Sequence, residues 1–250
     1  MSSACRLLLI ALLSLPGLAG AGEVRVAVAA NFVPTLRQLA DEFTASTGHR
    51  VTISSASTGK LYAQIVNGAG FDLFLSADAE RPERLEREGY GIAGERFVYA
   101  LGRLALWLPQ HHAVEDPGDI MLSPAVRRIA IANPRLAPYG LAARQVLQAW
   151  GLWDEVQSRL VRGENIAQTL QFVASGNAQA GFVALSQLRA MSDPPAGVQL
   201  TLPASLHEPI AQHAILLRRG EAAEALAAYL RGERARELIV AAGYDMPGGD

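Results

Sequence analysis

Cysteine is nearly absent from this chain of 250 residues, in which Cys5 is the single example. Cys5 precedes an apolar run near the N-terminus, on the wrong side of that run for a lipid-attachment cysteine. The remainder of the chain therefore has no disulfide and no thiol chemistry, which excludes a cysteine nucleophile and a thiolate metal site.

An excess of basic charge is also missing. The chain has 22 Lys and Arg residues against 24 Asp and Glu residues, and Lys60 is its only lysine. The first 21 residues hold one Arg and no acid, so their removal would leave 21 basic against 24 acidic side chains, a net charge of −3. That balance offers no basic face for nucleic acid, and we expect no nucleic-acid partner.

No apolar run is long enough to span a bilayer as a helix. The run from Leu7 to Leu15 is broken only by Ser14, follows Arg6, and leads to the small residues Ala19-Gly20-Ala21. A short positive region, a short apolar region and a small-x-small site are typical of a secretory signal. We therefore expect residues 1–21 to be removed after export and the mature protein to be periplasmic.

Motifs of the common hydrolases are lacking. Neither G-x-S-x-G nor H-E-x-x-H occurs. The run 57–60, S-T-G-K, matches the short S-x-x-K of serine acylases, but S-D-N and K-T-G partners are absent. A phosphate loop fails as well, because position 54 is Ser instead of Gly and Leu61 replaces the magnesium-binding Ser or Thr. We expect no enzymatic activity and no cofactor.

Strand and helix patterns alternate along the chain. Strands are predicted by β-branched or continuous apolar runs, and helices by apolar residues three and four apart. The predicted strands cover 23–30, 50–55, 71–76, 128–132, 158–161 and 180–185, and the predicted helices 32–43, 60–66, 79–88, 141–150, 166–174, 222–230 and 234–242. This alternation is typical of an α/β fold with a mostly parallel sheet.

Two longer extended segments, 97–108 and 208–217, interrupt this alternation. They divide the chain into a signal peptide at 1–21, a first lobe at 22–100 plus 209–250, and a second lobe at 101–208. A hinge is then expected near 99–103 and 208–212. A single sheet of about ten elements is the alternative, because it would give a similar pattern.

Four turns share one design, in which a strand ends and a helix begins. They are Ala30-Asn31, Ser57-Thr58-Gly59, Pro138-Tyr139-Gly140 and Glu164-Asn165-Ile166. Helix starts carry unpaired backbone N–H groups and partial positive charge, so they bind anions. In open α/β sheets such turns gather at the carboxyl edge of the strands. For any one turn alone, ordinary capping by Asn31 or Thr58 explains the sequence equally well.

Five segments, in order and over nearly the whole chain after residue 21, resemble the periplasmic molybdate-binding proteins of ABC transporters. They are A-V-A-A-N-F (27–32), S-T-G-K-L-Y-A-Q-I (57–65), F-D-L-F-L-S-A-D (71–78), A-N-P-R-L-A-P-Y-G (132–140) and G-E-N-I-A-Q-T-L-Q-F-V (163–173). The segments at 57–65 and 132–140 are the more specific. The resemblance implies a two-lobed type II periplasmic-binding fold that binds molybdate or tungstate between the lobes.

The resemblance also implies the residues that bind the oxyanion. Asn31 would donate its backbone N–H and side-chain amide, and Thr58 its backbone N–H and hydroxyl. Tyr139 and Ile166 would donate their backbone N–H groups alone. No free metal cation is implied, because molybdenum would be bound as its oxyanion.

The sequence departs from the family pattern at two positions. Thr58 stands where Ser is usual, which adds a methyl group. Ala184 stands where some members have a ligating Tyr, although the branch with Asn at the first ligand position does without it. We expect Lys60 at the mouth of the cleft and Glu164 turned away from the anion, because its carboxylate would repel it.

These donors match a proton-free dianion such as molybdate, because none of them is an acceptor-only group. Hydrogen phosphate carries a P–OH donor, which would face an N–H or O–H donor of the site. Sulfate has no such proton and stays open as an alternative ligand. A metal-capture protein is a weaker alternative, based on His111, His112, Glu115 and Asp116 in one loop. The expected partners are the oxyanion and a membrane permease of an ABC importer, and the protein is expected to be a monomer.

Overall fold

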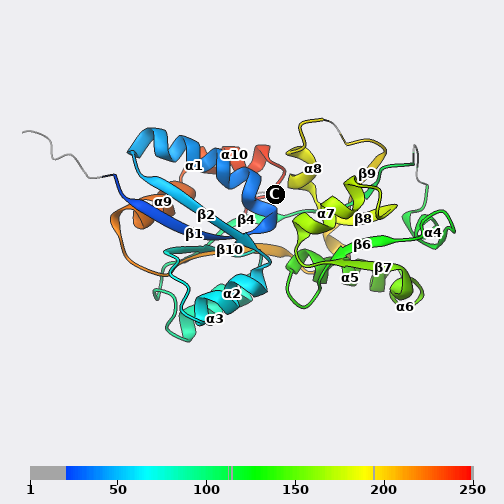
Figure 1. Ribbon diagram of the computed structural model, residues 1–250, viewed down its shortest axis with the longest axis horizontal. Coiled ribbons are helices and arrows are strands. Elements are labelled where there is room, and N and C mark those ends of the chain that lie inside the picture. The colour runs from blue at the N-terminus through cyan, green and yellow to red at the C-terminus, as the bar shows by residue number, and fades with distance from the viewer. Residues whose placement is uncertain (1–20, 112, 114, 194, 249–250) are drawn as a thin grey trace, which may run out of the picture.

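Two five-stranded sheets organise the chain into two lobes that lie side by side (Figure 1). The structure is a computed structural model that describes residues 21–111, 113, 115–193 and 195–248. Apart from Ala21, the predicted signal peptide lies outside the described residues. Within the described part of the chain, no helix combines the length and apolar character that crossing a membrane requires.

The first sheet combines the N-terminal strands with two strands from later in the chain. Its order is β2 (Arg50–Ala56), β1 (Glu23–Ala29), β3 (Leu73–Leu75), β10 (Ile210–Leu216) and β4 (Arg96–Gly102). Strands β1, β2 and β3 pair in parallel, whereas β10 runs antiparallel to both of its neighbours. Parallel pairing needs a crossover, which helices provide.

Helices cover both faces of the first sheet. One face packs against α1 (Val33–Thr47), α9 (Glu221–Arg231) and α10 (Glu233–Ala241), and the other against α2 (Thr58–Val66) and α3 (Glu80–Arg87). Alternation in β1 explains this, because Val26 points to the first set of helices and Ala27 to the second. Burying each large apolar side chain contributes about 1.5–3 kcal/mol.

The second sheet has the order β7 (Leu160–Gly163), β6 (Ile129–Ala132), β8 (Ala180–Ala184), β5 (Leu104–Leu108) and β9 (Val198–Thr201). Its helices are α4 (Pro117–Leu122), α5 (Pro138–Ala149), α6 (Trp153–Val156), α7 (Ile166–Ala174) and α8 (Leu185–Arg189). Val146 of α5 packs on one face and Val173 of α7 on the other. The 3₁₀ helices are η1 (Ala30–Phe32), η2 (Gln157–Arg159) and η3 (Ala204–Leu206).

The chain passes between the sheets twice. It leaves the first sheet at Arg103, the single residue between β4 and β5, and returns between β9 and β10. The prediction of two α/β lobes joined by two crossover segments is confirmed, and a single sheet of ten elements is wrong. The predicted boundary between residues 100 and 101 falls inside β4, which pairs with β10 through Gly102. The exact division into lobes therefore stays a proposal.

Several predicted boundaries shift in the structure. Helix α5 begins at Pro138, where we predicted a turn to 140, because proline is well suited to the first turn of a helix. Helix α2 begins at Thr58 and not at Lys60. Four elements, α4, α6, α8 and β9, were not predicted, because they have only four to six residues each and so too few for a clear periodicity.

Candidate functional site

The four predicted ligand residues lie around one small cavity between the lobes. Asn31 follows β1, Thr58 follows β2, Tyr139 opens α5 after β6, and Ile166 opens α7 after β7. β1 pairs in parallel with β2, and β6 in parallel with β7, so the four turns lie at carboxyl edges of the two sheets. The remaining lining residues are Ala29, Ala30, Ser57, Ala77, Ala137, Pro138 and Asn165.

Each of the four residues presents a backbone N–H group at the start of a helix. Thr58 and Ile166 are the first residues of α2 and α7, and Tyr139 is the second residue of α5. Asn31 lies in η1, directly before α1. Backbone N–H groups in a first turn have no intrahelical acceptor, and the helix dipole adds positive potential. The cavity is therefore surrounded by donors from both lobes.

Burial makes these donors strong. The exposed fraction is 1% for Asn31, Thr58 and Tyr139 and 3% for Ile166. No lining residue carries a carboxylate, an amine or a guanidinium. Burial raises the pKa of the Tyr139 phenol well above its usual value, so this group stays neutral at physiological pH. The cavity is thus lined by buried residues and free of negative charge.

Capping does not explain Asn31 or Thr58. Neither η1 nor α1 receives a side-chain cap from Asn31, and Thr58 lies inside α2, after the N-cap position. Among the four turns of the site, side-chain capping is seen at Asn165, whose Oδ1 accepts a hydrogen bond from the Gln168 backbone N–H at 3.0 Å. The alternative that Asn31 and Thr58 satisfy their own helices is wrong.

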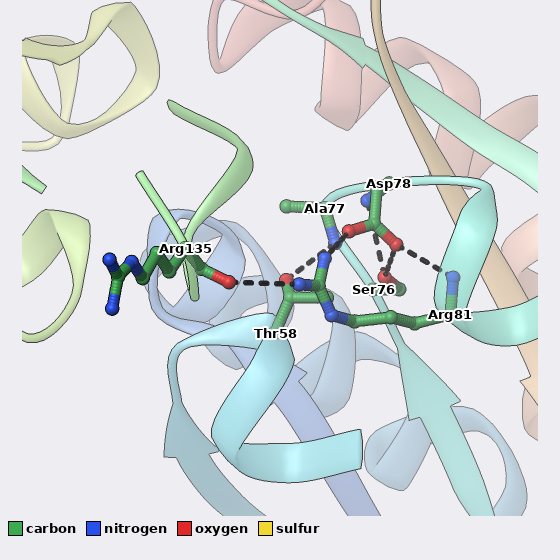
Figure 2. Close-up of polar contacts among 6 residues, drawn as sticks. All are labelled: Thr58, Ser76, Ala77, Asp78, Arg81 and Arg135. Carbon is green, nitrogen blue, oxygen red and sulfur yellow. Dashed lines mark hydrogen bonds and ion pairs between the residues drawn. The ribbon is translucent and has the colours of Figure 1, made fainter. Parts of the chain in front are cut away.

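The Thr58 hydroxyl is held in place by the neighbouring strand end (Figure 2). Thr58 Oγ1 accepts a hydrogen bond of 3.1 Å from the backbone N–H of Ala77. A hydroxyl that accepts here keeps its own hydrogen for another partner. Its hydrogen is thus available to an acceptor in the cavity.

Asn31 takes part in a buried polar network. Its Nδ2 atom donates to Gln212 Oε1 at 2.9 Å and to the Tyr244 hydroxyl at 3.1 Å. The Tyr99 hydroxyl bonds to the same Gln212 oxygen at 2.8 Å, and Gln212 Nε2 donates to the Tyr139 hydroxyl at 3.2 Å. Both amide hydrogens of Asn31 thus have protein partners. Donation by this amide to an anion stays a prediction, and it requires one of these bonds to be exchanged.

Lys60 and Glu164 lie outside the cavity and form an ion pair between the lobes. Their side chains are 43% and 62% exposed. Neither residue lines the cavity, and the carboxylate of Glu164 is occupied by the ammonium group. Ala184 is buried at the end of β8, where it pairs with Leu104.

A larger cavity of about 510 Å³ adjoins the small one and shares Ala77, Ala137 and Pro138 with it. Its charged lining residues are Asp78, Glu80, Glu208, Arg81 and Arg135. Three carboxylates against two guanidinium groups make it a poor environment for a dianion. In Figure 2, Arg81 pairs with Asp78 and donates to the Arg135 carbonyl oxygen at 3.2 Å, which links the two lobes.

The described residues of the loop with His111, Glu115 and Asp116 form no cluster of metal ligands. Within residues 21–111, 113, 115–193 and 195–248, no three His, Cys, Asp or Glu side chains are grouped as metal ligands. His112 lies outside the described residues.

Three residues that support Asn31 were not predicted: Gln212, Tyr99 and Tyr244. Gln212 was detectable, because it and His213 are the two polar residues in the strand I-A-Q-H-A-I-L, whose other residues are apolar. Tyr244 gave no signal, since it is 213 positions away from Asn31. Ser57 was not predicted as a ligand, because it was interpreted only as part of the turn at 57–59 and of the S-x-x-K match at 57–60.

Comparisons with known proteins agree with this architecture. The family described as "Bacterial extracellular solute-binding protein" matches residues 24–245. The molybdate-binding protein ModA of Azotobacter vinelandii is 48% identical over 91% of this chain and 92% of its own length. The corresponding protein of Rhodobacter capsulatus is 42% identical over 97% of this chain and 95% of its own length.

A solved structure of the periplasmic molybdate-binding protein of Azotobacter vinelandii superposes with a TM-score of 0.84. It is 43% identical, and the match covers 90% of this chain and 99% of that chain. The predicted family and the two-lobed periplasmic-binding fold are confirmed. This chain belongs to the bacterial extracellular solute-binding proteins, in the family of the periplasmic molybdate-binding proteins.

Proposed function

We propose that the protein captures molybdate, and also tungstate, at the small cavity between its lobes and delivers it to the permease of an ABC importer. The cavity has a volume of about 10 Å³, so it has to widen for the anion to enter. The observation that supports this most is the donor set of the cavity. Asn31, Thr58, Tyr139 and Ile166 present backbone N–H groups from both lobes to one buried space without a carboxylate. Relatives with 48% and 42% identity are named molybdate-binding proteins.

The protonation state of the anion accounts for selection against phosphate. Molybdate and tungstate are fully deprotonated at neutral pH and carry four acceptor oxygens. Hydrogen phosphate must also donate a proton, and the lining residues include no carboxylate to accept it. A donor that faces a donor in a buried site costs about 1–3 kcal/mol. Sulfate has no such proton, so its rejection has to depend on its shorter bonds and smaller size.

Hydrogen bonding is sufficient for tight binding without an arginine in the cavity. A hydrogen bond to a charged group contributes about 1.5–3 kcal/mol. Six such bonds, two each from Asn31 and Thr58 and one each from Tyr139 and Ile166, would exceed the roughly 8 kcal/mol of micromolar affinity. The excess offsets the ordering and desolvation costs of binding.

Ligand binding and lobe closure are coupled in this proposal. The lobes are taken as residues 22–100 plus 209–250 and residues 101–208, with the crossovers near 99–103 and 208–212 as the hinge. An anion that touches both lobes stabilises the closed state, because only that state satisfies all of its oxygens. The permease would then recognise the closed form.

Export completes the proposal. Residues 1–21 would direct the chain through the membrane and be removed after Ala21, which leaves a periplasmic monomer with no cofactor and no enzymatic activity. N-terminal sequencing of exported protein checks the cleavage site, and a mature chain that starts at Met1 would contradict it.

The proposed ligand is tested by calorimetry on the mature protein. Molybdate and tungstate should bind with one anion per chain at micromolar affinity or better, and phosphate should give no heat of binding. Tighter binding of sulfate than of molybdate would assign the protein to sulfate. Saturable zinc binding without any oxyanion response would overturn the proposal in favour of metal capture.

A further inference from the structure

Ser57 occupies a capping position without acting as a cap. It directly precedes α2 and has the extended backbone conformation of an N-cap residue, with φ −68° and ψ 149°. Serine at this position normally accepts a hydrogen bond from a backbone N–H two or three residues later. No such bond forms, and the Gly59 N–H donates to the Leu136 carbonyl oxygen of the other lobe at 2.9 Å.

The Ser57 hydroxyl is also buried without any partner. The residue is 3% exposed, and within the described part of the chain no group bonds to its Oγ. Burying a hydroxyl with no hydrogen bond costs free energy that an alanine would avoid. Such a group is rare in a folded protein and indicates a partner that comes from outside the chain.

Ser57 lines the same cavity as the four ligand residues. The oxygen of its neighbour Thr58 accepts a hydrogen bond from the Ala77 N–H at 3.1 Å, whereas the Ser57 hydroxyl has no donor and no acceptor among the described residues. A hydroxyl next to a bound dianion would donate, because the anion presents acceptors only.

We propose that the Ser57 hydroxyl donates a hydrogen bond to the bound oxyanion and is a further affinity-determining residue of the site. This inference rests on the proposed function. The turn between β2 and α2 then supplies two adjacent hydroxyls, one held by Ala77 and one held ready for the ligand. In the closed, ligand-bound protein the orphan hydroxyl acquires its missing partner.

The test is Ser57→Ala in the mature protein, with molybdate titrated by calorimetry. The dissociation constant should rise by about tenfold to a hundredfold, the usual effect of removing one hydrogen bond to a charged group. The melting temperature without ligand should stay equal or rise, because an unpaired buried hydroxyl has been removed. Ser55→Ala is the matched control, since it makes the same change at an exposed position two residues away and should alter neither quantity.

Three results would overturn the inference. If Ser57→Ala binds molybdate as tightly as the unmodified protein does, Ser57 is not a ligand, while the proposed function stands. If the variant instead melts lower without ligand and keeps its affinity, Ser57 has a structural role only. If the unmodified protein binds neither molybdate nor tungstate, the proposed function fails and the Ser57 inference fails with it.

Discussion

The backbone N–H of Gly59 donates a hydrogen bond of 2.9 Å to the carbonyl oxygen of Leu136, and these two residues belong to opposite lobes. Gly59 lies in the first turn of α2, directly after Thr58, and Leu136 lies just before α5. A Cβ atom on Gly59 would lie 3.1 Å from Leu136 Cδ2 and 3.2 Å from both its Cα and its carbonyl oxygen. The absence of a side chain at Gly59 therefore lets the lobes meet beside the cavity.

Gly59→Ala should weaken molybdate binding while the fold is preserved. Alanine favours the helix by about 0.5–1 kcal/mol, but the added methyl opposes the contact with Leu136 in the closed state. We expect the dissociation constant to rise by about fivefold to fiftyfold, since overpacking costs about 1–3 kcal/mol. Calorimetry and a melting curve without ligand measure both effects. Gly220→Ala is the control, because nothing lies within 4 Å of its added Cβ.

Three substitutions of Thr58 should show separately how an added negative charge, the hydroxyl and the methyl group affect the affinity for molybdate. Thr58→Asp should abolish binding by repelling the anion, and Thr58→Ala should weaken it by removing a donor. Thr58→Ser keeps the hydroxyl that accepts from Ala77 and should retain at least the original affinity. Unchanged calorimetric affinity in the Asp and Ala variants would remove Thr58 from the site. Melting curves are needed beside them, since Thr58→Ala also leaves the Ala77 N–H without its acceptor.

The Lys60–Glu164 ion pair should affect the rate of binding more than the affinity. Both side chains are largely exposed, and such pairs contribute about 0–1 kcal/mol. Lys60→Met should change the dissociation constant by less than about fivefold, while it slows anion association and reduces the dependence of that rate on salt. Stopped-flow measurements at two ionic strengths check this, with Lys60→Arg as the control that keeps the charge. A complete loss of binding in Lys60→Met would instead make Lys60 a direct ligand.

Local sequence patterns predict most of the helices and strands but not how the strands are ordered in the sheets. Helix α7 was predicted over its full range, 166–174, because Asn165 gives a clear start and the apolar spacing is regular. Helix α5 was predicted three residues late, since its proline was interpreted as a turn. Local patterns define where elements lie, but only pairing in space shows that β10 returns between β3 and β4.

The candidate site shows the same limit. The resemblance named Asn31, Thr58, Tyr139 and Ile166, and all four line one cavity, although their ligand roles stay predictions. The groups that support Asn31 were not predictable from local sequence, because Gln212 lies 181 positions away. Hydrogen bonds between such distant groups follow from the packing of β10 and the C-terminal segment, which no motif encodes.

The stability of the protein should decrease as the pH falls below the usual range of histidine, in part through His213. Burial is the main cause that lowers the pKa of His213, and nearby Arg96 lowers it further, while Asp78 and Glu83 act in the opposite direction. The folded state thus binds fewer protons than the unfolded state, so this contribution is present above the unfolded pKa, about 6.5, and is lost as the pH falls through the lower folded pKa. His213→Gln should flatten urea-unfolding stability between about pH 7 and 5. An identical slope in the variant would show that other groups dominate.

Gln212→Leu should destabilise the protein more than any change of an exposed residue, because Gln212 connects three buried polar groups. Its Oε1 accepts from Asn31 and Tyr99, and its Nε2 donates to Tyr139 of the other lobe. Leucine fills similar space but removes all three bonds, at about 0.5–1.5 kcal/mol for each, because Asn31 keeps the Tyr244 hydroxyl and Tyr99 keeps the Ser76 carbonyl oxygen as a partner. Tyr139→Phe removes one bond of this network and should cost about 1 kcal/mol. A double-mutant cycle measures the energetic coupling between the two residues. Tyr139→Phe should cost less when residue 212 is already leucine, because their hydrogen bond has been lost before. Additive costs would show that Gln212 and Tyr139 act independently, so that their hydrogen bond does not couple β10 to the opposite lobe.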